Sequence, residues 1–352
     1  MTDGVLLRES LSEKFNSYSI IILDEAHERS LDTDILIALL KSHLLTNKYF
    51  RLIITSATID VQLFSTYFNK CPVITIPGRQ YPIEILHSAC KSDRRVEYTV
   101  NAAIRIHLHE GPGDVLAFLT GSDECERAKS KCFEALQQLQ TQGNEVPSML
   151  ILSLYGAMSS EEQAKVFKRT PEDCRKVVFS TNISETSITI DGIGYVIDCG
   201  YAKQKKFNPT TSLEALMIVP ISKQQARQRA GRAGRTQAGR CFRLYSESFY
   251  DEQMSESTEA EIFRSNLASV ILTLKILKID LLQFQFLESP EKGSILHAIK
   301  QLFYINAIDE SGNLTPLGKE ISRFPLDPCF ARCLISSLIT KCSEEMIQVI
   351  TK

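Results

Sequence analysis

This sequence of 352 residues lacks a long hydrophobic run, a strong net charge and any CxxC pair of cysteines. Without a run of about 18 apolar residues or a signal peptide, a membrane or secretory destination is not expected. The formal net charge of −2 argues against a uniformly basic surface for nucleic acid. Ten scattered cysteines fit neither a zinc site nor a dense disulfide framework, which predicts reduced thiols and a location in the nucleus or cytoplasm.

What remains is an ordinary globular composition, with 43% hydrophobic and 23% charged residues. At about 100–200 residues per domain, the length predicts two or three domains. Short apolar runs alternate with helix-period stretches through most of the chain, a pattern typical of parallel sheets covered by helices. Strands are predicted at residues 19–23, 51–55, 115–119, 149–154, 176–180 and 195–198, and helices at residues 31–45, 123–139 and 160–168.

Helical periodicity dominates from residue 246 onward. The pattern predicts helices over residues 261–277 and 292–304, a short hairpin at residues 307–315, and a helix from Pro328 to the last residue. Two helices followed by a hairpin are compatible with a small winged-helix module. The proline-rich segment of residues 71–82 is the expected linker between the two sheet-forming lobes.

Two carboxylates, Asp24 and Glu25, directly follow the predicted strand of residues 19–23. Parallel sheets bind ligands at the carboxyl ends of strands, where Asp24 would suit hydrated Mg²⁺ and Glu25 would activate a water that attacks a phosphate. Acidic residues are also favoured at any helix N-terminus, so the pair alone leaves that second interpretation open. Ser56 and Thr58 follow the next predicted strand at the same edge, either to couple the site to a moving neighbour or as an ordinary helix N-cap.

Residues 201–245 concentrate positive charge, with ten Lys and Arg against one acidic residue. Such a block suits phosphates, although a solvated face is the alternative. Within it, a helix over residues 228–235 would place Gln228, Arg232 and Arg235 on one face. Its two glycines would cost about 1 kcal/mol each relative to alanine, which indicates that something packs against the backbone there. Two arginines directed together at a phosphate supply charge during phosphoryl transfer, whereas the alternative is a solvated basic helix.

In their order and spacing, these segments resemble the motifs of the DEAH/RHA group of superfamily 2 RNA helicases over nearly the whole chain. The matching segments are residues 2–4 with 6–9 (motif Ib), 24–27 (motif II), 56–58 (motif III), 118–121 (motif IV), 180–193 (motif V) and 228–235 (motif VI). Residues 314–318 and 324–328 resemble the end of the family's winged helix and the start of its ratchet-like domain.

The resemblance implies an α/β fold with two RecA-like parallel-sheet lobes, the first one incomplete. The implied domains are a partial RecA-like lobe over residues 1–82, a second RecA-like lobe over residues 83–245, an α-helical winged-helix module over residues 246–320, and the start of a ratchet-like helical domain over residues 321–352.

The resemblance also implies roles for single side chains at an ATP and Mg²⁺ site. Asp24 and Glu25 would serve the metal, and Glu25 would also activate water. The other implied catalytic residues are His27 and Gln228, which would link the lobes, and the arginine fingers Arg232 and Arg235. The implied nucleotide contacts are Thr189, Asp191 and Phe167, although Phe167 is equally an ordinary core residue of its helix.

For nucleic acid, the resemblance implies grip on an RNA backbone without base readout. The implied RNA-binding residues are Thr2, Arg79, Thr181, Asn182, Ser187, Lys203 and Lys205, of which the last two lie in a hairpin over residues 200–220. Ser56 and Thr58 would couple the nucleotide site to RNA movement.

The implied activity is an RNA-stimulated ATPase and 3′-to-5′ helicase. Its partner would be single-stranded RNA, or a duplex with a single-stranded tail. A glycine-patch activator protein is implied by the resemblance alone, and no membrane is expected. The competing hypotheses are a non-catalytic RNA-binding or regulatory fragment and, third, a DNA translocase.

One family element has no counterpart, because the sequence contains no GxxGxGKT segment. The one Gly-Lys pair, Gly318-Lys319, lies far from the expected place. Without the backbone amides and lysine of such a loop, the phosphates of ATP lose their main ligands. The sequence therefore predicts weak or absent ATP hydrolysis by this chain, and suggests a helicase truncated before motif Ib.

Overall fold

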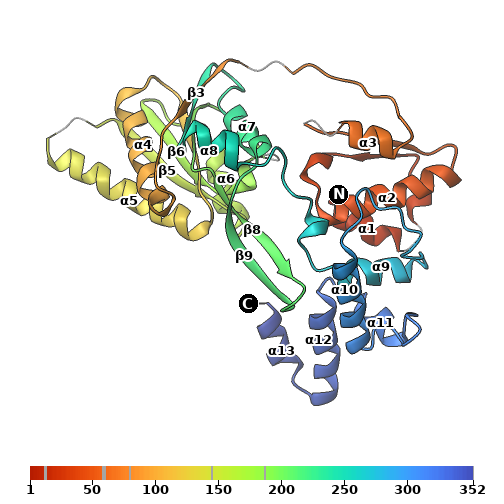
Figure 1. The fold of residues 1–352 in the computed structure, drawn as a ribbon. Helices are drawn as coiled ribbons and strands as arrows, with labels where there is room; N and C mark the ends of the chain where they lie inside the picture. The colour runs from red at the N-terminus through yellow and green to blue at the C-terminus, as the bar shows by residue number, and fades with distance from the viewer. Residues whose placement is uncertain (12–13, 58–60, 79–80, 144–145, 186–187, 352) are drawn as a thin grey trace. The chain divides into compact units, whose positions relative to one another are not determined.

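A computed structural model describes residues 1–11, 14–57, 61–78, 81–143, 146–185 and 188–351. The chain divides into two compact units (Figure 1). The first unit comprises Met1–Ile74, Lys205–Ala215 and Glu259–Lys352, and the second comprises Thr75–Gln204 and Leu216–Thr258. The predicted division into four domains follows other boundaries and stays a prediction.

The second unit is built on a six-stranded sheet in the order β3-β10-β7-β4-β6-β5, in which every neighbouring pair is parallel. The strands are β3 (Ile83–His87), β4 (Asp114–Phe118), β5 (Ser148–Leu154), β6 (Cys174–Ser180), β7 (Ile193–Asp198) and β10 (Gly239–Arg243). The four strands predicted for this lobe are confirmed, with modest shifts at their ends. The sequence pattern does not predict β3 and β10, because side chains such as Glu84 and Arg240 interrupt their apolar residues.

Helices cover both faces of this sheet (Figure 1). They are α4 (Arg95–His109), α5 (Ser122–Thr141), α6 (Ser160–Phe167), α7 (Lys223–Gly231) and the short α8 (Glu247–Gln253). Val115 and Ala117 of β4 lie in one core with α4 and α5, whereas Leu116 and Phe118 lie in the other with α6 and α7. Successive strand residues point to opposite faces, so a continuous apolar strand fits a sheet that is buried on both sides.

The first unit contains a two-stranded parallel sheet of β1 (Ile20–Leu23) and β2 (Arg51–Ile54). The helices α1 (Asp3–Ser10), α2 (Leu31–Thr46) and α3 (Val61–Tyr67) share one core with these strands. Ser30 begins α2 as its N-cap, because its hydroxyl accepts a hydrogen bond from the Thr33 N–H at 3.2 Å. Both strands and the helix between them are confirmed.

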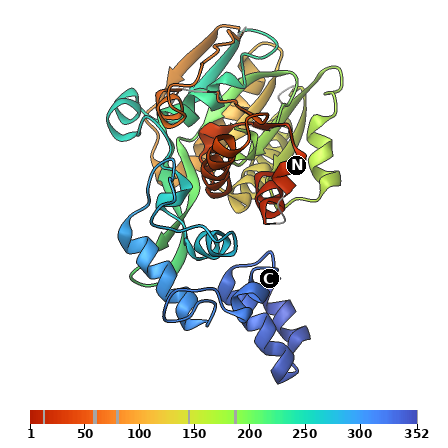
Figure 2. The same ribbon diagram turned by 90° about the vertical axis from the view of Figure 1, so that its right-hand side faces the viewer.

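The last segment of this unit, from Glu259 onward, is mainly helical. The elements are the 3₁₀ turn η5 (Glu261–Phe263), α9 (Ala268–Ile276), α10 (Lys292–Tyr304), α11 (Pro316–Ile321), α12 (Pro328–Thr340) and α13 (Ser343–Ile350). The predicted helix over residues 261–277 is wrong in its first half, because the Asn266 side chain accepts the Ala268 N–H and begins α9 there. The predicted final helix is also broken, since Lys341 adopts a left-handed conformation between α12 and α13 (Figure 1 and Figure 2).

Two predicted hairpins are confirmed. β8 (Tyr201–Asn208) and β9 (Leu213–Pro220) form a separate two-stranded sheet. An isolated antiparallel bridge joins Ile308 to Leu314. Across the described part of the chain, no helix combines the length and the apolar character needed to cross a bilayer.

Candidate nucleotide and nucleic-acid site

The carboxyl ends of β1 and β2 bring the predicted acidic and hydroxyl segments together in the first unit. The Thr55 N–H donates to the Leu23 carbonyl at 2.9 Å, and the Ala26 N–H donates to the Thr55 carbonyl at 3.0 Å. Asp24 Oδ1 accepts hydrogen bonds from the Glu25 N–H at 2.9 Å and from the Thr55 hydroxyl. These two bonds hold the Asp24 carboxylate at an exposed position beyond the strand.

The turn after Asp24 has an unusual backbone. Glu25 (φ 54°, ψ 33°) and Arg29 (φ 50°) both adopt the left-handed conformation, on either side of the 3₁₀ turn η2 (Ala26–Glu28). This conformation costs a residue with a side chain roughly 1–2 kcal/mol, so other contacts must hold the turn.

His27 joins the acidic turn to the segment after β2. Its Nδ1 accepts the Ala57 N–H at 3.2 Å and lies 3.4 Å from Glu25 Oε2. These contacts tie the His27 ring both to Glu25 and to the segment that follows β2.

Arg29 anchors the acidic turn to the helical part of the first unit. Its guanidinium donates to Asp34 at 2.8 and 3.0 Å and contacts Glu288 at 2.7 Å. Glu261 adds two bonds, because its N–H donates to the Arg29 carbonyl at 3.0 Å and its carboxylate accepts the Leu31 N–H at 2.9 Å. Burial lowers the pKa of Arg29, but the hydrogen bonds and charges of Asp34 and Glu288 outweigh it and raise the pKa on balance.

The two predicted arginine fingers are held against one loop of the second unit. Arg232 donates to the carbonyl oxygens of Glu185 and Ile188, the latter at 3.2 Å. Arg235 donates to the Thr189 hydroxyl. Each guanidinium therefore contacts the loop that carries the predicted nucleotide contact Thr189.

The arginines lie at the end of α7 rather than within it. α7 ends at Gly231, so the predicted helix over residues 228–235 is wrong in its second half. Close packing against the backbone is confirmed at Gly234, where a Cβ would lie 2.8 Å from the Tyr81 carbonyl and from Ile83. The Tyr81 N–H also donates to the Gly234 carbonyl at 3.0 Å, so the neighbour is the chain that enters β3.

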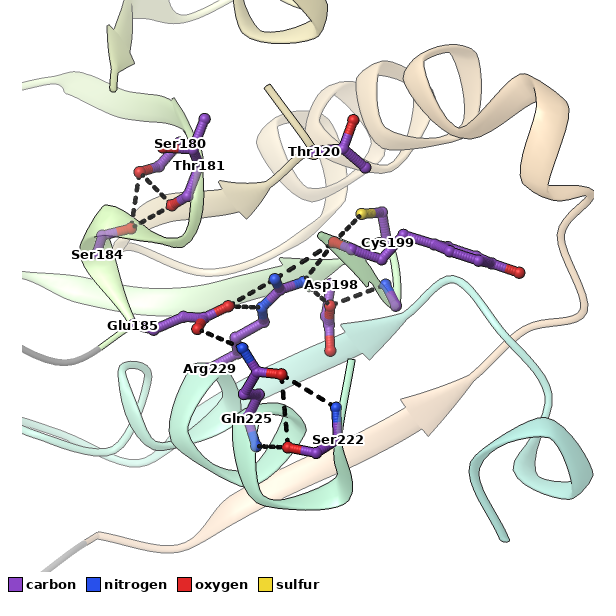
Figure 3. A network of polar contacts seen from close by, with 12 residues as sticks. Thr120, Ser180, Thr181, Ser184, Glu185, Asp198, Cys199, Ser222, Gln225 and Arg229 are labelled. Atoms are coloured by element: carbon purple, nitrogen blue, oxygen red, sulfur yellow. Dashed lines mark hydrogen bonds and ion pairs between the residues drawn. The ribbon is translucent and has the colours of Figure 1, made fainter. Parts of the chain in front are cut away.

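Arg229, for which the sequence predicts no separate role, is the centre of a buried polar network (Figure 3). Its fully buried guanidinium donates at 2.7 Å to both Glu185 Oε1 and Asp198 Oδ1. Gln225 donates to the other oxygen of Glu185 at 3.0 Å, and the Tyr245 hydroxyl donates to the other oxygen of Asp198 at 2.8 Å. Burial lowers the pKa of Arg229, but the charges of Glu185 and Asp198 raise it by more, so Arg229 stays charged.

This network joins three parts of the second unit: the loop that contains Glu185, the carboxyl end of β7 at Asp198, and α7. Glu185 binds two of the arginines, since its carboxylate accepts from Arg229 and its backbone carbonyl accepts from Arg232. One signal was available in the sequence. An acid that closes a buried strand, as Asp198 does, needs a charged partner.

The basic segment of residues 201–245 is not an open cationic surface, because acidic partners neutralise much of it. The ion pairs are Lys205–Glu214 at 2.5 Å, Lys223–Glu256 at 2.8 Å, Arg227–Glu256 at 3.8 Å, Arg229–Asp198 at 2.7 Å and Arg240–Glu84 at 2.7 Å. Most of these acids come from other parts of the sequence. Counting charges in one window therefore overstates the cationic character of the segment.

The remaining predicted residues lie mostly at the carboxyl edge of the large sheet. Thr181 follows β6, and Asn182 begins the 3₁₀ turn η4 (Asn182–Ser184). Lys203 packs over Gly121, since a Cβ on that glycine would lie 2.7 Å from Lys203 Nζ. Phe167 is the last residue of α6 and is 48% exposed.

Other predicted positions are spread over both units. Thr2 directly precedes α1, Ser56 is exposed after β2, and Thr189 and Asp191 are exposed in their loop. Thr58, Arg79 and Ser187 lie outside the described residues.

A metal held by protein groups alone has no place in the described ranges, where no three His, Cys, Asp or Glu side chains form a cluster. Mg²⁺ is commonly bound by one or two carboxylates together with substrate phosphates and water. The exposed Asp24, fixed through Oδ1, fits that mode of binding.

The parallel sheet of the second unit, the arginines that follow α7 and the helical segment of the first unit together fit the class of helicases. The family described as "Helicase conserved C-terminal domain" matches residues 94–237, and "Helicase associated domain (HA2), winged-helix" matches residues 298–326. The chain is 46% identical over 352 residues to the pre-mRNA-splicing factor ATP-dependent RNA helicase prp22 of Schizosaccharomyces pombe. That match covers 99% of this chain and 30% of the relative, so the chain spans about a third of the relative's length.

The comparisons support the similarity to DEAH-box helicases that the motifs indicate. The resemblance inferred from the motifs is thereby confirmed, as is the α/β fold class with a winged-helix module.

Proposed function

We propose that this chain forms part of an ATP-dependent RNA helicase, which couples ATP hydrolysis to translocation on RNA and to unwinding. The observation that carries this proposal is the geometry after β1, where bonds from Thr55 and Ala57 set the positions of Asp24 and His27 around Glu25. Ligands of parallel sheets bind at this edge. The similarity to a protein named as an ATP-dependent RNA helicase supports the same function.

In this proposal, Asp24 holds hydrated Mg²⁺, and Glu25 accepts a proton from the water that attacks the terminal phosphate. ATP would supply the phosphoryl group, and Mg²⁺ held at Asp24 would neutralise part of its charge. Arg232 and Arg235 stabilise the charge that develops on the transferred group. Because both arginines are bonded to their own loop, each must exchange a carbonyl or hydroxyl partner for a phosphate oxygen.

Further nucleotide contacts come from the second unit. We assign Thr189, Asp191 and Phe167 to ATP, and the exposure of all three is compatible with ligand contact. We also assign His27 and Gln228 to the nucleotide site.

RNA binds, in this proposal, at the carboxyl edge of the large sheet. β4 and β6 are neighbours, with Phe118 opposite Ser180. The segments that follow these strands therefore lie side by side, and they include Gly121 and Thr181. The proposed contacts to the RNA backbone are Thr2, Arg79, Thr181, Asn182, Ser187, Lys203 and Lys205, with Ser56 and Thr58 coupling RNA movement to the nucleotide site.

The substrate class is single-stranded RNA, or a duplex with a single-stranded tail. The relative is named as a pre-mRNA-splicing factor, and we propose pre-mRNA as the setting for this chain too, in the nucleus or the cytoplasm. A glycine-patch protein is the proposed type of activator.

A second candidate is a non-catalytic RNA-binding or regulatory role. The absence of a GxxGxGKT segment from the sequence favours it, because phosphates then lack their usual backbone cradle.

The decisive experiment measures RNA-stimulated ATPase activity and RNA binding of the 352-residue chain beside its Glu25→Gln variant. A lost general base should lower turnover by about 100-fold or more, without changing RNA affinity. Glu28→Gln is the matched control, because Glu28 is an exposed acid of the same turn. Equal activity in both proteins would contradict the role of Glu25. RNA binding without activity in either would favour the second candidate.

A further inference from the structure

A buried lysine of β6, Lys176, lies beneath the end of α6. Its side chain is almost wholly buried, with the residue 1% exposed. Its Nζ donates to the carbonyl oxygens of Val166 at 3.0 Å and Lys168 at 3.1 Å, which flank Phe167 on either side. The last carbonyls of a helix lack partners within the helix, and a cation there is favourable. Lys176 therefore fixes the backbone on both sides of Phe167.

Asp114, the first residue of β4, connects this lysine to a second loop. Asp114 Oδ2 lies 3.7 Å from Lys176 Nζ and accepts the Thr170 hydroxyl at 2.5 Å, while Oδ1 accepts the Lys176 N–H at 2.9 Å. The Asp114 N–H donates to the Gly192 carbonyl at 2.9 Å. Because Gly192 directly follows Asp191, the same pair of charges borders two of the proposed nucleotide contacts.

The bonds from Lys176 matter for Phe167 because the core does not enclose the Phe167 side chain. Val166 is fully buried in the core, whereas the neighbouring Phe167 remains 48% exposed. The ring of Phe167 therefore depends on its backbone for orientation rather than on enclosure by the core. A buried charge is costly and is often replaceable by apolar residues in a stable core, so Lys176 suits a position where geometry matters.

We propose that Lys176, balanced by Asp114, is a positioning residue for the nucleotide base. It holds Phe167 in the orientation that stacks on adenine, and it aligns the Asp191 loop beside it. This proposal rests on the proposed ATP binding, and it differs from a purely structural role, which would stabilise the whole unit without a local effect at Phe167.

The natural chain contains no tryptophan, so Phe167→Trp supplies a single fluorescent reporter in the 352-residue protein. Acrylamide quenching and time-resolved anisotropy are measured with and without Lys176→Met. The lysine change should increase both the quenching and the amplitude of nanosecond motion at the reporter. Lys165→Met, which removes an exposed charge from the same helix, should leave both unchanged.

A second reporter separates local from general loosening. Phe133 lies on α5 of the same unit and is 56% exposed. The fluorescence of a Phe133→Trp reporter should therefore not respond to Lys176→Met. If neither reporter responds, or if both respond equally, the positioning role is wrong. Should Lys176→Met fail to fold, Thr170→Val removes one bond to Asp114 and should give a smaller change in the same direction. No change in Thr170→Val would then overturn the proposal.

A second experiment tests nucleotide binding with ATP and with tripolyphosphate, which has no base. ATP should quench the Phe167→Trp reporter, and Lys176→Met should weaken its apparent affinity by about tenfold, as expected for lost hydrogen bonds from a charged donor. The affinity for tripolyphosphate should not change. If ATP leaves the reporter unaffected in both backgrounds, the proposed ATP binding fails, whereas the anisotropy comparison still decides whether Lys176 positions residue 167.

Discussion

Replacing Arg229 with methionine should be among the most destabilising single changes in the second unit. The substitution leaves Glu185 and Asp198 buried without their cation, although the guanidinium now donates to each at 2.7 Å. Breaking a buried ion pair from one side costs about 3–5 kcal/mol. For a unit of this size, that loss lowers the melting temperature by roughly 6–20 °C.

Circular dichroism during heating would measure the effect, with Arg227→Met as the matched control on the same helix. Arg227 is exposed and lies 3.8 Å from Glu256, so its loss should shift melting by at most about 3 °C. Adding Glu185→Gln to Arg229→Met removes one of the stranded charges and should recover part of the stability. An Arg229→Met protein that melts with the control, or a double variant no better than the single one, would refute the reasoning.

Burial raises the pKa of the Cys125 and Cys132 thiols to about 12. Their reactive thiolate is therefore scarce below that pH, so alkylation at pH 8.5, followed by mass spectrometry, should be at least about 100-fold slower than in the urea-unfolded chain. Equal rates in both states would contradict the burial of these thiols. Gly200→Ala should lower the free energy of unfolding in urea by roughly 2–4 kcal/mol, because φ is +79° and the new Cβ would lie 2.5 Å from Tyr245 Cδ1. Gly156→Ala has open space and should change it by less than about 0.5 kcal/mol, so equal stability of the two variants would contradict this account.

The sequence allows much of the fold to be predicted wherever one local rule decides the outcome. Residues 115–118 of the central strand β4 form a continuous apolar run because both faces of the strand are buried. The predicted helix over residues 160–168 is likewise found as α6, which begins with a capping box of Ser159 and Glu162. Local rules do not predict β10, because Arg240 and Arg243 interrupt its apolar residues. Whether a strand can contain such charged residues depends on partners elsewhere in the chain.

In the candidate site, too, local rules predict some features, whereas others depend on tertiary contacts. Because parallel strands end at one edge of a sheet, Asp24 is expected to lie near the segment after β2. The structure confirms this contact. The left-handed turn at Glu25 and its clamp from Arg29 to Glu288 depend on tertiary contacts that no local pattern encodes. The partners of Arg229, separated from it by 44 and 31 residues, are of the same kind.

The three arginines near the end of α7 differ in the hydrogen-bond partners that a bound phosphate would have to replace. Arg229 is fully buried between two carboxylates, so no phosphate can replace its partners without stranding charge. The contacts of Arg232 and Arg235 include neutral acceptors, namely a pair of carbonyl oxygens and the Thr189 hydroxyl. Hydrogen bonds to an anionic phosphate are about twice as strong as those to neutral groups, so in the proposed function a polyphosphate would compete for these contacts. Their exchange would release the loop that carries Thr189, while Arg229 keeps that loop attached to α7 through Glu185. In the proposed function, the buried Arg229 would therefore stay in place while Arg232 and Arg235 change partners.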